Sequence, residues 1–362
     1  MEELLRANWS RYAQNHAEAI LSIVIPVYNV QAYLTACLDS ITEQKLEDIE
    51  IVVVDGASTD DLAEILWQRS AHDPRITAIR TDRIGPGRAR NLGAELAMGQ
   101  YVWFVDGDDA VAPDCLTAVA DRLEILRPDV LLLDHEERLP DGTVEASSGH
   151  ELIARDTEAC FALAEHPWVT ELTMAAWNKV IRRDFFLSQP VKFLPDWPHE
   201  DVPVSCLLLV DAAKLSLLKQ VCYRHTLYRA GSAMAEAGKR HFNILAAYEL
   251  VLGMIQSRFD AHDPDVTAAI RLAFFQRAIW HYTTIFDAGP LMVGDFIANA
   301  DRREFYTRMH ENFVRFVPLG YRYPRGFRGL KFRMIKRNAY WIYSILSPVN
   351  KLRVRTIRRG SS

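Results

Sequence analysis

The sequence predicts an α/β protein with a mostly parallel sheet flanked by helices, followed by a helical C-terminal extension. Short apolar, β-branched segments recur through residues 21–135, and segments with helical periodicity separate them. Beyond residue 136 this alternation ends, and the chain reads mostly as helices and loops up to His310. With 362 residues, 49% of them hydrophobic, the chain can bury a large core in one enlarged domain or in two.

The clearest strand prediction is residues 21–28, LSIVIPVY, which are apolar, largely β-branched and bounded by polar residues. Such a segment is typical of a strand buried on both faces of a parallel sheet. Four later segments share this character and are predicted as strands: 49–54, 76–80, 101–105 and 130–134.

Each predicted helix between these strands carries one apolar face. The first is marked by apolar residues at i, i+3, i+4, i+7, i+8 and i+11, namely Val30, Tyr33, Leu34, Cys37, Leu38 and Ile41. Further helices are expected at 60–71, 89–97 and 113–126, the last with a proline near its first turn. Because strands and helices alternate, we expect parallel strands with helices on both faces of the sheet.

The cysteines and the N-terminus exclude several protein classes. The five cysteines are odd in number and far apart, and no C-x-x-C occurs, so neither a disulfide framework nor a zinc knot is supported. Residues 1–16 are polar and lack the order of a secretory signal, and no apolar run reaches the ~20 residues of a membrane span. We expect a cytoplasmic protein.

The C-terminal end is strongly basic, although the whole chain has a net charge of -5. After Glu311 there is no Asp or Glu, whereas 13 of the 42 Lys and Arg lie there, mixed with aromatic residues such as Tyr323, Phe332 and Trp341. This composition suits a peripheral contact with an anionic membrane, at the inner face of the cell membrane. A solvated tail that pairs with the acidic body is an equal alternative, and nucleic acid is the less favoured partner.

Candidate binding residues follow the predicted strands, where ligands bind in open parallel sheets. Asp55 directly follows the second strand, and it comes too early to cap the next helix, which favours a contact with a nucleotide base or ribose. Asp60 is expected to cap that helix instead.

A glycine-rich segment, Gly85-Pro86-Gly87-Arg88-Ala89-Arg90-Asn91-Leu92-Gly93, opens the helix after the third strand. It is neither a dinucleotide fingerprint, because Arg90 stands at the third glycine, nor a P-loop. Backbone donors and two arginines there could face a phosphate, while a tight turn with a solvated Arg88 is equally compatible.

The most specific candidate is Asp106-Gly107-Asp108-Asp109, directly after the apolar strand at 101–105. Like charges repel, and a bound divalent cation removes that cost. Carboxylates together with pyrophosphate oxygens are the usual ligands of Mg²⁺ or Mn²⁺ where no Gly-Lys cradle exists. The alternative is a surface Asp-Gly turn in which Asp109 caps the helix near Pro113.

The succession SIVIPVYN, VVVDGASTDD, GPGRARNLG and YVWFVDGDD resembles the family 2 glycosyltransferases with the GT-A fold, a Rossmann-like nucleotide-diphospho-sugar transferase fold. The resemblance covers residues 21 to about 230 in the family's order. It implies that Asp106 and Asp108 hold a divalent cation, Mn²⁺ or Mg²⁺, on the donor diphosphate. It further implies that a group of residues binds the donor nucleotide: Pro26, Tyr28, Asp55, Arg90, Asn91, Asp106 and Arg229. Glycine at 107 stands where the family more often has serine, a difference we expect to change little.

Two later segments extend the resemblance. Trp177-Asn178-Lys179 is similar to the family's acceptor-side element, and Glu200-Asp201 to its catalytic-base motif, with Asp201 as the expected base and Glu200 as the alternative. Both acids could instead simply favour a helix start through the helix dipole. Ser232 with the arginine at 229 resembles an element that closes over the diphosphate.

The predicted domains are an N-terminal helical lead at 1–20, a glycosyltransferase domain at 21–235 divided near residue 135, a helical extension at 236–311 and a basic aromatic segment at 312–362. The predicted activity is transfer of a sugar, with inversion, from a nucleotide-diphosphate sugar to a hydroxyl of a saccharide or lipid-linked acceptor, in cell-surface polysaccharide or glycolipid synthesis. The alternatives are a catalytically silent sugar-binding module and a sugar nucleotidyltransferase, although the activating loop of the latter is absent.

Overall fold

The structure is a computed structural model that describes residues 19–139, 141–147, 149–154, 159–195, 197–227, 238–258, 264–287 and 296–346. These residues form two compact units. The first, here called the sheet unit, comprises the described residues up to 195 together with Val204–Leu227. The second, here called the helical unit, comprises Trp197–Pro203 and the described residues from 238 onward. The predicted helical lead lies almost wholly outside the described residues.

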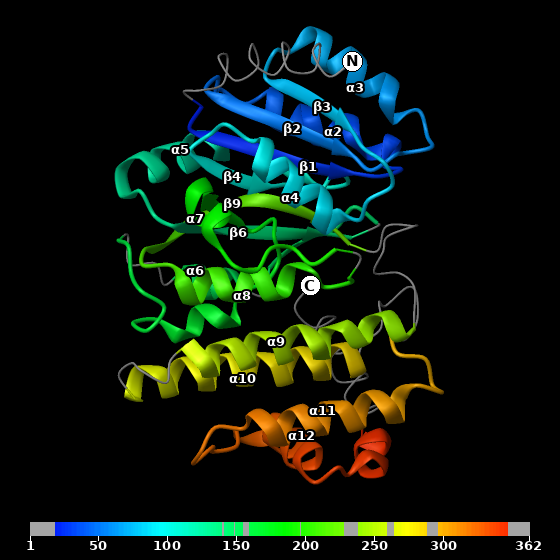
Figure 1. Ribbon diagram of the computed structural model, residues 1–362, viewed down its shortest axis with the longest axis vertical. Helices are drawn as coiled ribbons and strands as arrows, with labels where there is room; N and C mark the ends of the chain where they lie inside the picture. The colour runs from blue at the N-terminus through cyan, green and yellow to red at the C-terminus, as the bar shows by residue number, and fades with distance from the viewer. Residues whose placement is uncertain are drawn as a thin grey trace. The chain divides into compact units, whose positions relative to one another are not determined.

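The sheet unit is built on one mixed sheet with strand order β3-β2-β1-β4-β8-β6-β9-β5, and β7 pairs with β6 at its margin. Strands β1 to β4, β6 and β9 of this sheet are labelled in Figure 1. Its strands are β1 (Leu21–Val27), β2 (Ile49–Asp55), β3 (Ile76–Arg80), β4 (Tyr101–Phe104), β5 (Ala110–Val111), β6 (Val130–Arg138), β7 (Val144–Ala146), β8 (Lys179–Arg182) and β9 (Leu215–Thr226). Its helical segments are α2 (Gln31–Thr42), α3 (Leu62–His72), α4 (Pro86–Leu96), α5 (Cys115–Leu126), α6 (His150–Ile153), η1 (Pro167–Glu171) and α7 (Arg183–Ser188), and α8 (Asp201–Asp211) begins in the helical unit.

The first half of the sheet confirms the predicted alternation of parallel strands and helices. Strand β1 lies between β2 and β4 and runs parallel to both, with Leu21 opposite Ile49 and Val27 opposite Asp55. Every β2 residue is buried, as expected for a strand covered on both faces. Helix α2 buries the predicted face through Leu34 and its apolar neighbours along the helix.

The second half of the sheet differs from the prediction of helices and loops beyond residue 136. Strand β8 inserts between β4 and β6 and runs antiparallel to both. Strand β9 runs parallel to β6 and antiparallel to β5. The parallel arrangement therefore holds for β3-β2-β1-β4, and the rest of the sheet is mixed. The pairing of residues so far apart in the chain is a tertiary effect, which local patterns do not encode.

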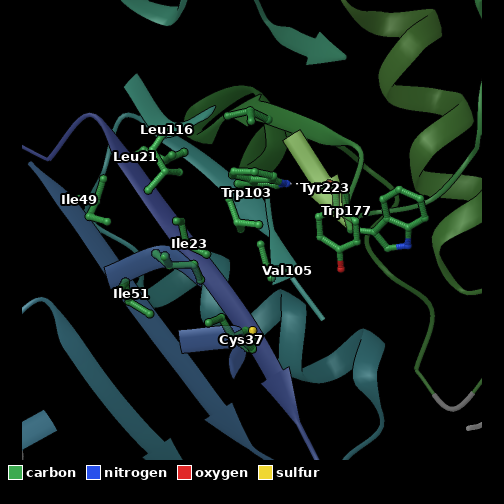
Figure 2. Packing of buried hydrophobic residues seen from close by; sticks show 14 of the residues in the cluster. Leu21, Ile23, Cys37, Ile49, Ile51, Trp103, Val105, Leu116, Trp177 and Tyr223 are labelled. Atoms are coloured by element: carbon green, nitrogen blue, oxygen red, sulfur yellow. Dashed lines mark hydrogen bonds between the residues drawn. The ribbon is translucent and has the colours of Figure 1, made fainter. Parts of the chain in front are cut away.

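An aromatic group forms the core between the two halves of the sheet (Figure 2). The rings of Trp177 and Tyr223 stack with centroids 4.6 Å apart, and Trp103 donates its indole N–H to the Trp177 carbonyl at 2.6 Å. Stacked aromatic pairs add about 0.5–1.5 kcal/mol beyond the area that they bury. This group lies directly before the turn that follows β4, so it fixes the base of that turn.

The helical unit confirms the predicted helical extension. Its helices are η2 (Lys239–Phe242), α9 (Asn243–Arg258), α10 (Pro264–Asp287), α11 (Arg302–Phe316) and α12 (Gly326–Lys336). Buried aromatic side chains such as Phe275, Tyr282 and Phe313 fill the space between α9, α10 and α11. None of the described helices combines the length and the apolar character that a bilayer crossing requires.

Candidate active site

The parallel strands β1, β2 and β4 end at the same edge of the sheet, and the candidate residues follow these ends. Val27 at the end of β1 pairs with Asp55 at the end of β2, and the Gly56 N–H donates to the Val27 carbonyl at 3.0 Å. The acidic turn, residues 106–109, follows β4 at the same edge. The structure thus brings the end of β1, Asp55 and the acidic turn to one edge of the sheet, as the rule for open parallel sheets predicts.

Reciprocal hydrogen bonds join the loops after β1 and β2. The Asn29 N–H donates to Ser58 Oγ at 3.0 Å, and the Thr59 N–H donates to Asn29 Oδ1 at 2.8 Å. Asp60 was predicted to cap α3, and this prediction is wrong: its Oδ2 accepts the N–H of Gln31, the first residue of α2, at 3.0 Å. The side chain therefore stabilises the neighbouring helix and locks the two loops together.

Asp55 is buried in the loop that it begins. Its Oδ1 accepts the Ser58 N–H at 2.8 Å, and its Oδ2 lies 3.1 Å from the Arg80 guanidinium. Arg80 also donates to the Ser58 carbonyl at 2.8 Å, which closes the turn. These hydrogen bonds hold the Asp55 carboxylate in one orientation, as recognition of a specific nucleotide base requires. Direct contact of Asp55 with a base stays a prediction.

Tyr28 is the exposed residue of the β1 end, and it lies 37% accessible beside the half-buried Pro26. The guanidinium carbon of Arg83 lies 3.2 Å from the centre of the Tyr28 ring. This cation–π contact covers one face of the Tyr28 ring. A planar base could therefore stack on the opposite face, or on the covered face after Arg83 moves.

Arg90 reaches the acidic turn from the buried face of α4. Its guanidinium donates to Asp106 Oδ1 at 2.7 Å and lies 5.5 Å from the centre of the Phe193 ring. Helix α4 can approach the sheet this closely because Gly93 has no side chain: a Cβ there would lie 2.3 Å from Val24 Cγ1. Of the two arginines predicted to face a phosphate, Arg90 is thus paired with a carboxylate, and Arg88 is exposed.

Asn91 has a structural role beside Arg90. Its Nδ2 donates to the Phe193 carbonyl at 2.9 Å, and its Oδ1 accepts the Phe193 N–H at 3.2 Å. The amide thus imitates a β-ladder pair and fixes the segment that carries Phe193. Asn91 therefore fixes the position of the Phe193 segment. Direct contact of Asn91 with a nucleotide-sugar donor stays a prediction.

Asp109 is the buried member of the acidic turn. The Tyr223 hydroxyl donates to its Oδ2 at 2.6 Å, and the Thr226 N–H donates to its Oδ1 at 2.7 Å. The alternative in which Asp109 caps α5 is therefore wrong, because the carboxylate instead holds strand β9. Burial raises the pKa of Asp109 well above its ordinary value, and the neighbouring Asp106 and Asp108 raise it further.

Asp106 and Asp108 are the half-buried members of the turn, and their negative potential extends to neighbouring groups. Burial raises the pKa of the Cys37 thiol, and Asp109, Asp108 and Asp106 add to this effect. A divalent cation beside Asp106 and Asp108 would relieve the repulsion, so the residues fit such an ion.

In the described part of the chain, no group of three or more His, Cys, Asp or Glu side chains is arranged to hold a metal. Mg²⁺ and similar ions commonly take one or two carboxylates and complete their coordination with substrate phosphates.

Gly107 is tightly packed, contrary to the expectation that serine there would change little. A Cβ at this position would lie 2.6 Å from Val27 Cγ1 and 3.3 Å from Val30 Cγ2. A serine would push Val27 or the turn itself away from its position. Glycine therefore allows the acidic turn to lie directly against the end of β1.

The element predicted to face an acceptor is buried. Lys179 Nζ donates to the Ala175 carbonyl at 2.8 Å and to Asn178 Oδ1 at 2.7 Å, and its side chain is 1% exposed. Asn178 donates to the Thr173 carbonyl at 2.9 Å. Trp177 stacks on Tyr223, whose hydroxyl donates to Asp109 of the acidic turn. Direct contact of this element with an acceptor stays a prediction.

The predicted catalytic acids belong to the helical unit. Glu200 is 8% exposed, and Asp201 is half-buried and begins α8. Both lie beside His199, whose φ of +64° is in the left-handed region. Arg229 and Ser232 lie outside the described residues.

Sequence reasoning missed two residues of β9 that support the site. The Asp106 N–H donates to the Tyr223 hydroxyl at 3.1 Å, and the same hydroxyl donates to Asp109, so Tyr223 holds both ends of the turn. The His225 ring stacks on Trp177 with centroids 4.9 Å apart, and burial lowers its pKa. The signal available was the apolar segment at 215–218 followed by VCYRH, which is β-like.

Comparison with known proteins agrees with this geometry. Residues 22–174 match the family described as Glycosyl transferase family 2. The uncharacterized glycosyltransferase YibD of Escherichia coli is 24% identical over 247 residues, which cover 65% of this chain and 70% of that protein. EpsJ of Bacillus subtilis, also named an uncharacterized glycosyltransferase, is 28% identical over 207 residues, 56% of this chain and 60% of that protein.

Staphylococcus aureus TarS, a poly(ribitol-phosphate) β-N-acetylglucosaminyltransferase, is 34% identical over 222 residues, which cover 60% of this chain but 37% of that protein. The crystal structure of TarS residues 1–349 in complex with UDP-GlcNAc superposes with a TM-score of 0.70 at 19% identity, covering 92% of this chain and 91% of that one. The fold is therefore that of this group, a mixed α/β sheet with flanking helices and a helical C-terminal region. Residues 22–174 of this chain therefore match glycosyltransferase family 2.

Proposed function

We propose that this protein transfers a sugar from a nucleoside diphosphate sugar to an acceptor hydroxyl, with inversion at the anomeric carbon and with a divalent cation bound. One observation carries the proposal: Asp106 and Asp108 follow β4 at the carboxyl edge of the parallel strands. Asp106 is held there by the Arg90 guanidinium at 2.7 Å and by the Tyr223 hydroxyl at 3.1 Å. Carboxylates preorganised at this edge suit a diphosphate donor with its metal ion.

The donor nucleotide would lie along the ends of β1 and β2. Tyr28 offers an exposed aromatic face, and Asp55 offers a fixed carboxylate that can accept from an N–H of the base. The related TarS structures contain UDP-GlcNAc and UDP, which favours a uridine diphosphate sugar here. Arg229 would neutralise the diphosphate.

Asp106 and Asp108 would hold Mn²⁺ or Mg²⁺ together with the donor diphosphate. Such an ion, when bound, stabilises the negative charge that develops on the leaving diphosphate. The protein's own contribution is to hold the carboxylates in place through Arg90 and Tyr223, which limits the reorganisation needed during transfer.

Asp201 would act as the general base, with Glu200 as the alternative. The base accepts the acceptor's hydroxyl proton while that oxygen attacks the anomeric carbon and the bond to the diphosphate oxygen breaks. A single displacement of this kind inverts the anomeric centre and needs no covalent enzyme intermediate. Trp177 would support the acidic turn through its stacking on Tyr223, and Asn178 and Lys179 would fix the backbone beside Trp177.

The acceptor is proposed to be a saccharide or lipid-linked chain at an anionic membrane. Relatives are named for polymer synthesis, including chondroitin synthase of Escherichia coli. In the helical unit, Trp341, Ile342 and Ile345 expose 69%, 58% and 75% of their surface. Exposed basic residues accompany them: Arg325, Arg328, Arg333, Lys336 and Arg337. Exposed aromatic and aliphatic groups beside basic ones match the interface of an anionic bilayer.

The proposal is tested by assaying transfer from uridine diphosphate sugars and following the anomeric proton of the product by NMR. Inverted product, with a kcat reduced at least about 100-fold in Asp201→Asn and much less in Glu200→Gln, supports it. Retained configuration contradicts the single displacement. Release of pyrophosphate from a nucleoside triphosphate and a sugar phosphate would indicate a nucleotidyltransferase. Donor binding without any turnover would indicate a catalytically silent module.

A further inference from the structure

We infer that His199 is a positioning residue, which fixes the turn carrying Glu200 and Asp201 by inserting its side chain among histidines of the helical unit. The catalytic meaning of this inference rests on the proposed function, because that proposal assigns the base to the turn. The inference itself concerns residues 197–203 and the helices α9 and α10, all of which belong to the helical unit.

The His199 side chain contacts two other histidines from distant parts of the sequence. Its Nε2 lies 3.4 Å from Nδ1 of His241 in η2, and the two ring centroids are 5.7 Å apart. The His281 ring on α10 packs edge-on against it with centroids 5.7 Å apart. His281 Nδ1 in turn lies 3.3 Å from the Tyr248 hydroxyl on α9. Segment η2 and helix α10 thus contact the turn before α8 directly, and α9 supports it through Tyr248.

The backbone at His199 is held in an unfavourable conformation. Its φ of +64° is in the left-handed region, which residues other than glycine seldom adopt. The Val202 N–H donates to the His199 carbonyl at 3.2 Å, so the strained residue begins the turn that leads into α8. Strain of this kind persists only where the surroundings fix the residue, and it is typical of functional sites.

Burial favours the neutral form of the His199 and His281 rings, so these two side chains act by packing and hydrogen bonding. Burial lowers the pKa of His199 to about 3, and His241 and Arg240 contribute to the lowering. Burial also lowers the pKa of His281 well below its ordinary value, and Arg277 and His199 add to this. Among the described residues, no group of three or more His, Cys, Asp or Glu side chains is arranged to hold a metal.

The consequence is that helices α9 and α10 contribute to catalysis without providing a reacting group. Their histidine and tyrosine side chains define the position of His199, and the two residues that follow it are the acids of the proposed base motif. A change at His281 should therefore disturb these acids as a change at His199 does, although the two positions are far apart in the sequence.

The test compares four variants of the full chain: His199→Ala, His199→Asn, His281→Ala and the control Tyr282→Phe. The control removes the buried hydroxyl of the residue that follows His281 in the sequence, which donates to the Leu245 carbonyl at 3.4 Å. Asparagine accepts the left-handed backbone and retains a polar side chain, so His199→Asn should rescue part of what His199→Ala loses. Folding is checked by circular dichroism and by the thermal midpoint.

Amide hydrogen exchange in the segment 197–203 is the primary measurement. We expect exchange there to be at least tenfold faster in His199→Ala and in His281→Ala than in the wild type, and close to the wild-type rate in Tyr282→Phe. With a donor that the protein uses, kcat should fall at least tenfold in the two alanine variants, while the donor KM stays within about twofold. Unchanged exchange in folded alanine variants, or equal acceleration in the control, would overturn the inference.

The two proposals can fail separately. If no uridine diphosphate sugar is turned over, the proposed function fails, yet faster exchange in the two alanine variants still establishes that His199 positions the turn. If transfer occurs and kcat is unaffected in both folded alanine variants, the proposed function stands and the positioning role is refuted. If His281→Ala does not fold, the pair His199→Ala and His199→Asn carries the same test.

Discussion

Tyr223 is the side chain on which the geometry of the acidic turn most depends. Its hydroxyl accepts from the Asp106 N–H and donates to Asp109, so one group joins both ends of the turn to strand β9. Because Asp109 is buried, removal of this donor leaves a carboxylate with one hydrogen bond fewer in a region of low polarity. The aromatic stacking with Trp177 would remain after a change to phenylalanine.

We therefore expect Tyr223→Phe to lower the free energy of unfolding by about 1–3 kcal/mol and to weaken Mn²⁺-dependent donor binding roughly tenfold. Urea unfolding and a titration with UDP-GlcNAc measure the two effects. Tyr306→Phe is the matched control, because the buried Tyr306 hydroxyl has no hydrogen-bond partner within the described structure. If both variants behave alike, the bridging role of Tyr223 is wrong.

Glu50 makes stability depend on pH, although it lies on β2 away from the candidate site. It accepts the Met98 N–H at 2.8 Å and pairs with Ser22, and burial raises its pKa from 4.5 to about 7. Since the folded state binds the proton more tightly, this stability is fully present below pH 4.5 and is lost as the pH rises to about 7. The loss amounts to about 3 kcal/mol at most.

Replacement of Glu50 by glutamine should remove this dependence. Relative to Glu50→Gln, the wild type should lose up to about 3 kcal/mol of unfolding free energy between pH 4.5 and pH 7.5. Urea unfolding at several pH values gives this difference, and Glu64→Gln on the exposed face of α3 serves as the control. A difference that is constant with pH would show that folding does not raise the pKa of Glu50.

Among the structural elements, the segment that carries Phe193 depends on a single amide. Asn91 on α4 makes both hydrogen bonds to the Phe193 backbone, and the Phe193 ring packs against Phe104 and Phe186. We expect Asn91→Ala to lower the free energy of unfolding by about 1–3 kcal/mol, because both bonds are lost. Asn91→Asp should be no more stable, since its carboxylate would face the Phe193 carbonyl.

The measurement also separates a structural role of Asn91 from a direct one. Donor affinity should change little in Asn91→Ala once the protein is folded, which an isothermal titration with UDP-GlcNAc and Mn²⁺ can establish. Unchanged stability together with lost donor binding would instead mean that Asn91 contacts the donor itself.

The parallel half of the sheet could be predicted from the sequence because each of its elements carries a local signal. Strand β1 is an uninterrupted apolar segment, and α2 repeats its apolar residues at helical spacing. The order of strands β8 and β9 could not be predicted, because Lys179–Arg182 is short and its partners on β4 and β6 lie far away in the chain. Local propensity is a weak guide where tertiary pairing decides.

Parts of the candidate site were predictable for the same reason. Asp106 and Asp108 follow a buried strand, and this position alone indicates ligand binding. The partners of these residues were not predicted. The β-like signal around Tyr223 does not specify its pairing with the acidic turn, and Asp60 supports α2 from across a loop. Lys179 was expected to face a ligand, but the carbonyls around it bury its ammonium group.

For the molecule as a whole, the separation of charge along the chain is the basis of the proposed contact with an anionic membrane. The basic residues after Glu311 accompany the exposed Trp341 and Ile345, whereas the chain before them is acidic. We expect the wild type to float with vesicles that contain about 30% phosphatidylglycerol, and this binding should weaken as salt screens the attraction.

A double variant tests the apolar part of this contact. Trp341→Ser with Ile345→Ser should weaken vesicle binding about tenfold, because each side chain buries apolar surface in the interface. Trp67→Ser is the control, since Trp67 on α3 is 67% exposed, much like Trp341. Equal binding by the wild type and the double variant would exclude an insertion of this surface into the bilayer.

The central claim, that Asp106 and Asp108 bind a nucleoside diphosphate sugar through a divalent cation, is tested most directly by calorimetric titration. A panel of nucleoside diphosphate sugars, with and without Mn²⁺, is titrated into the wild type, into Asp108→Asn and into the exposed control Asp184→Asn. We predict metal-dependent binding of at least one donor by the wild type and the control, and a loss of at least tenfold in affinity in Asp108→Asn. Binding that is equally strong without Mn²⁺, or unchanged in Asp108→Asn, would contradict the account.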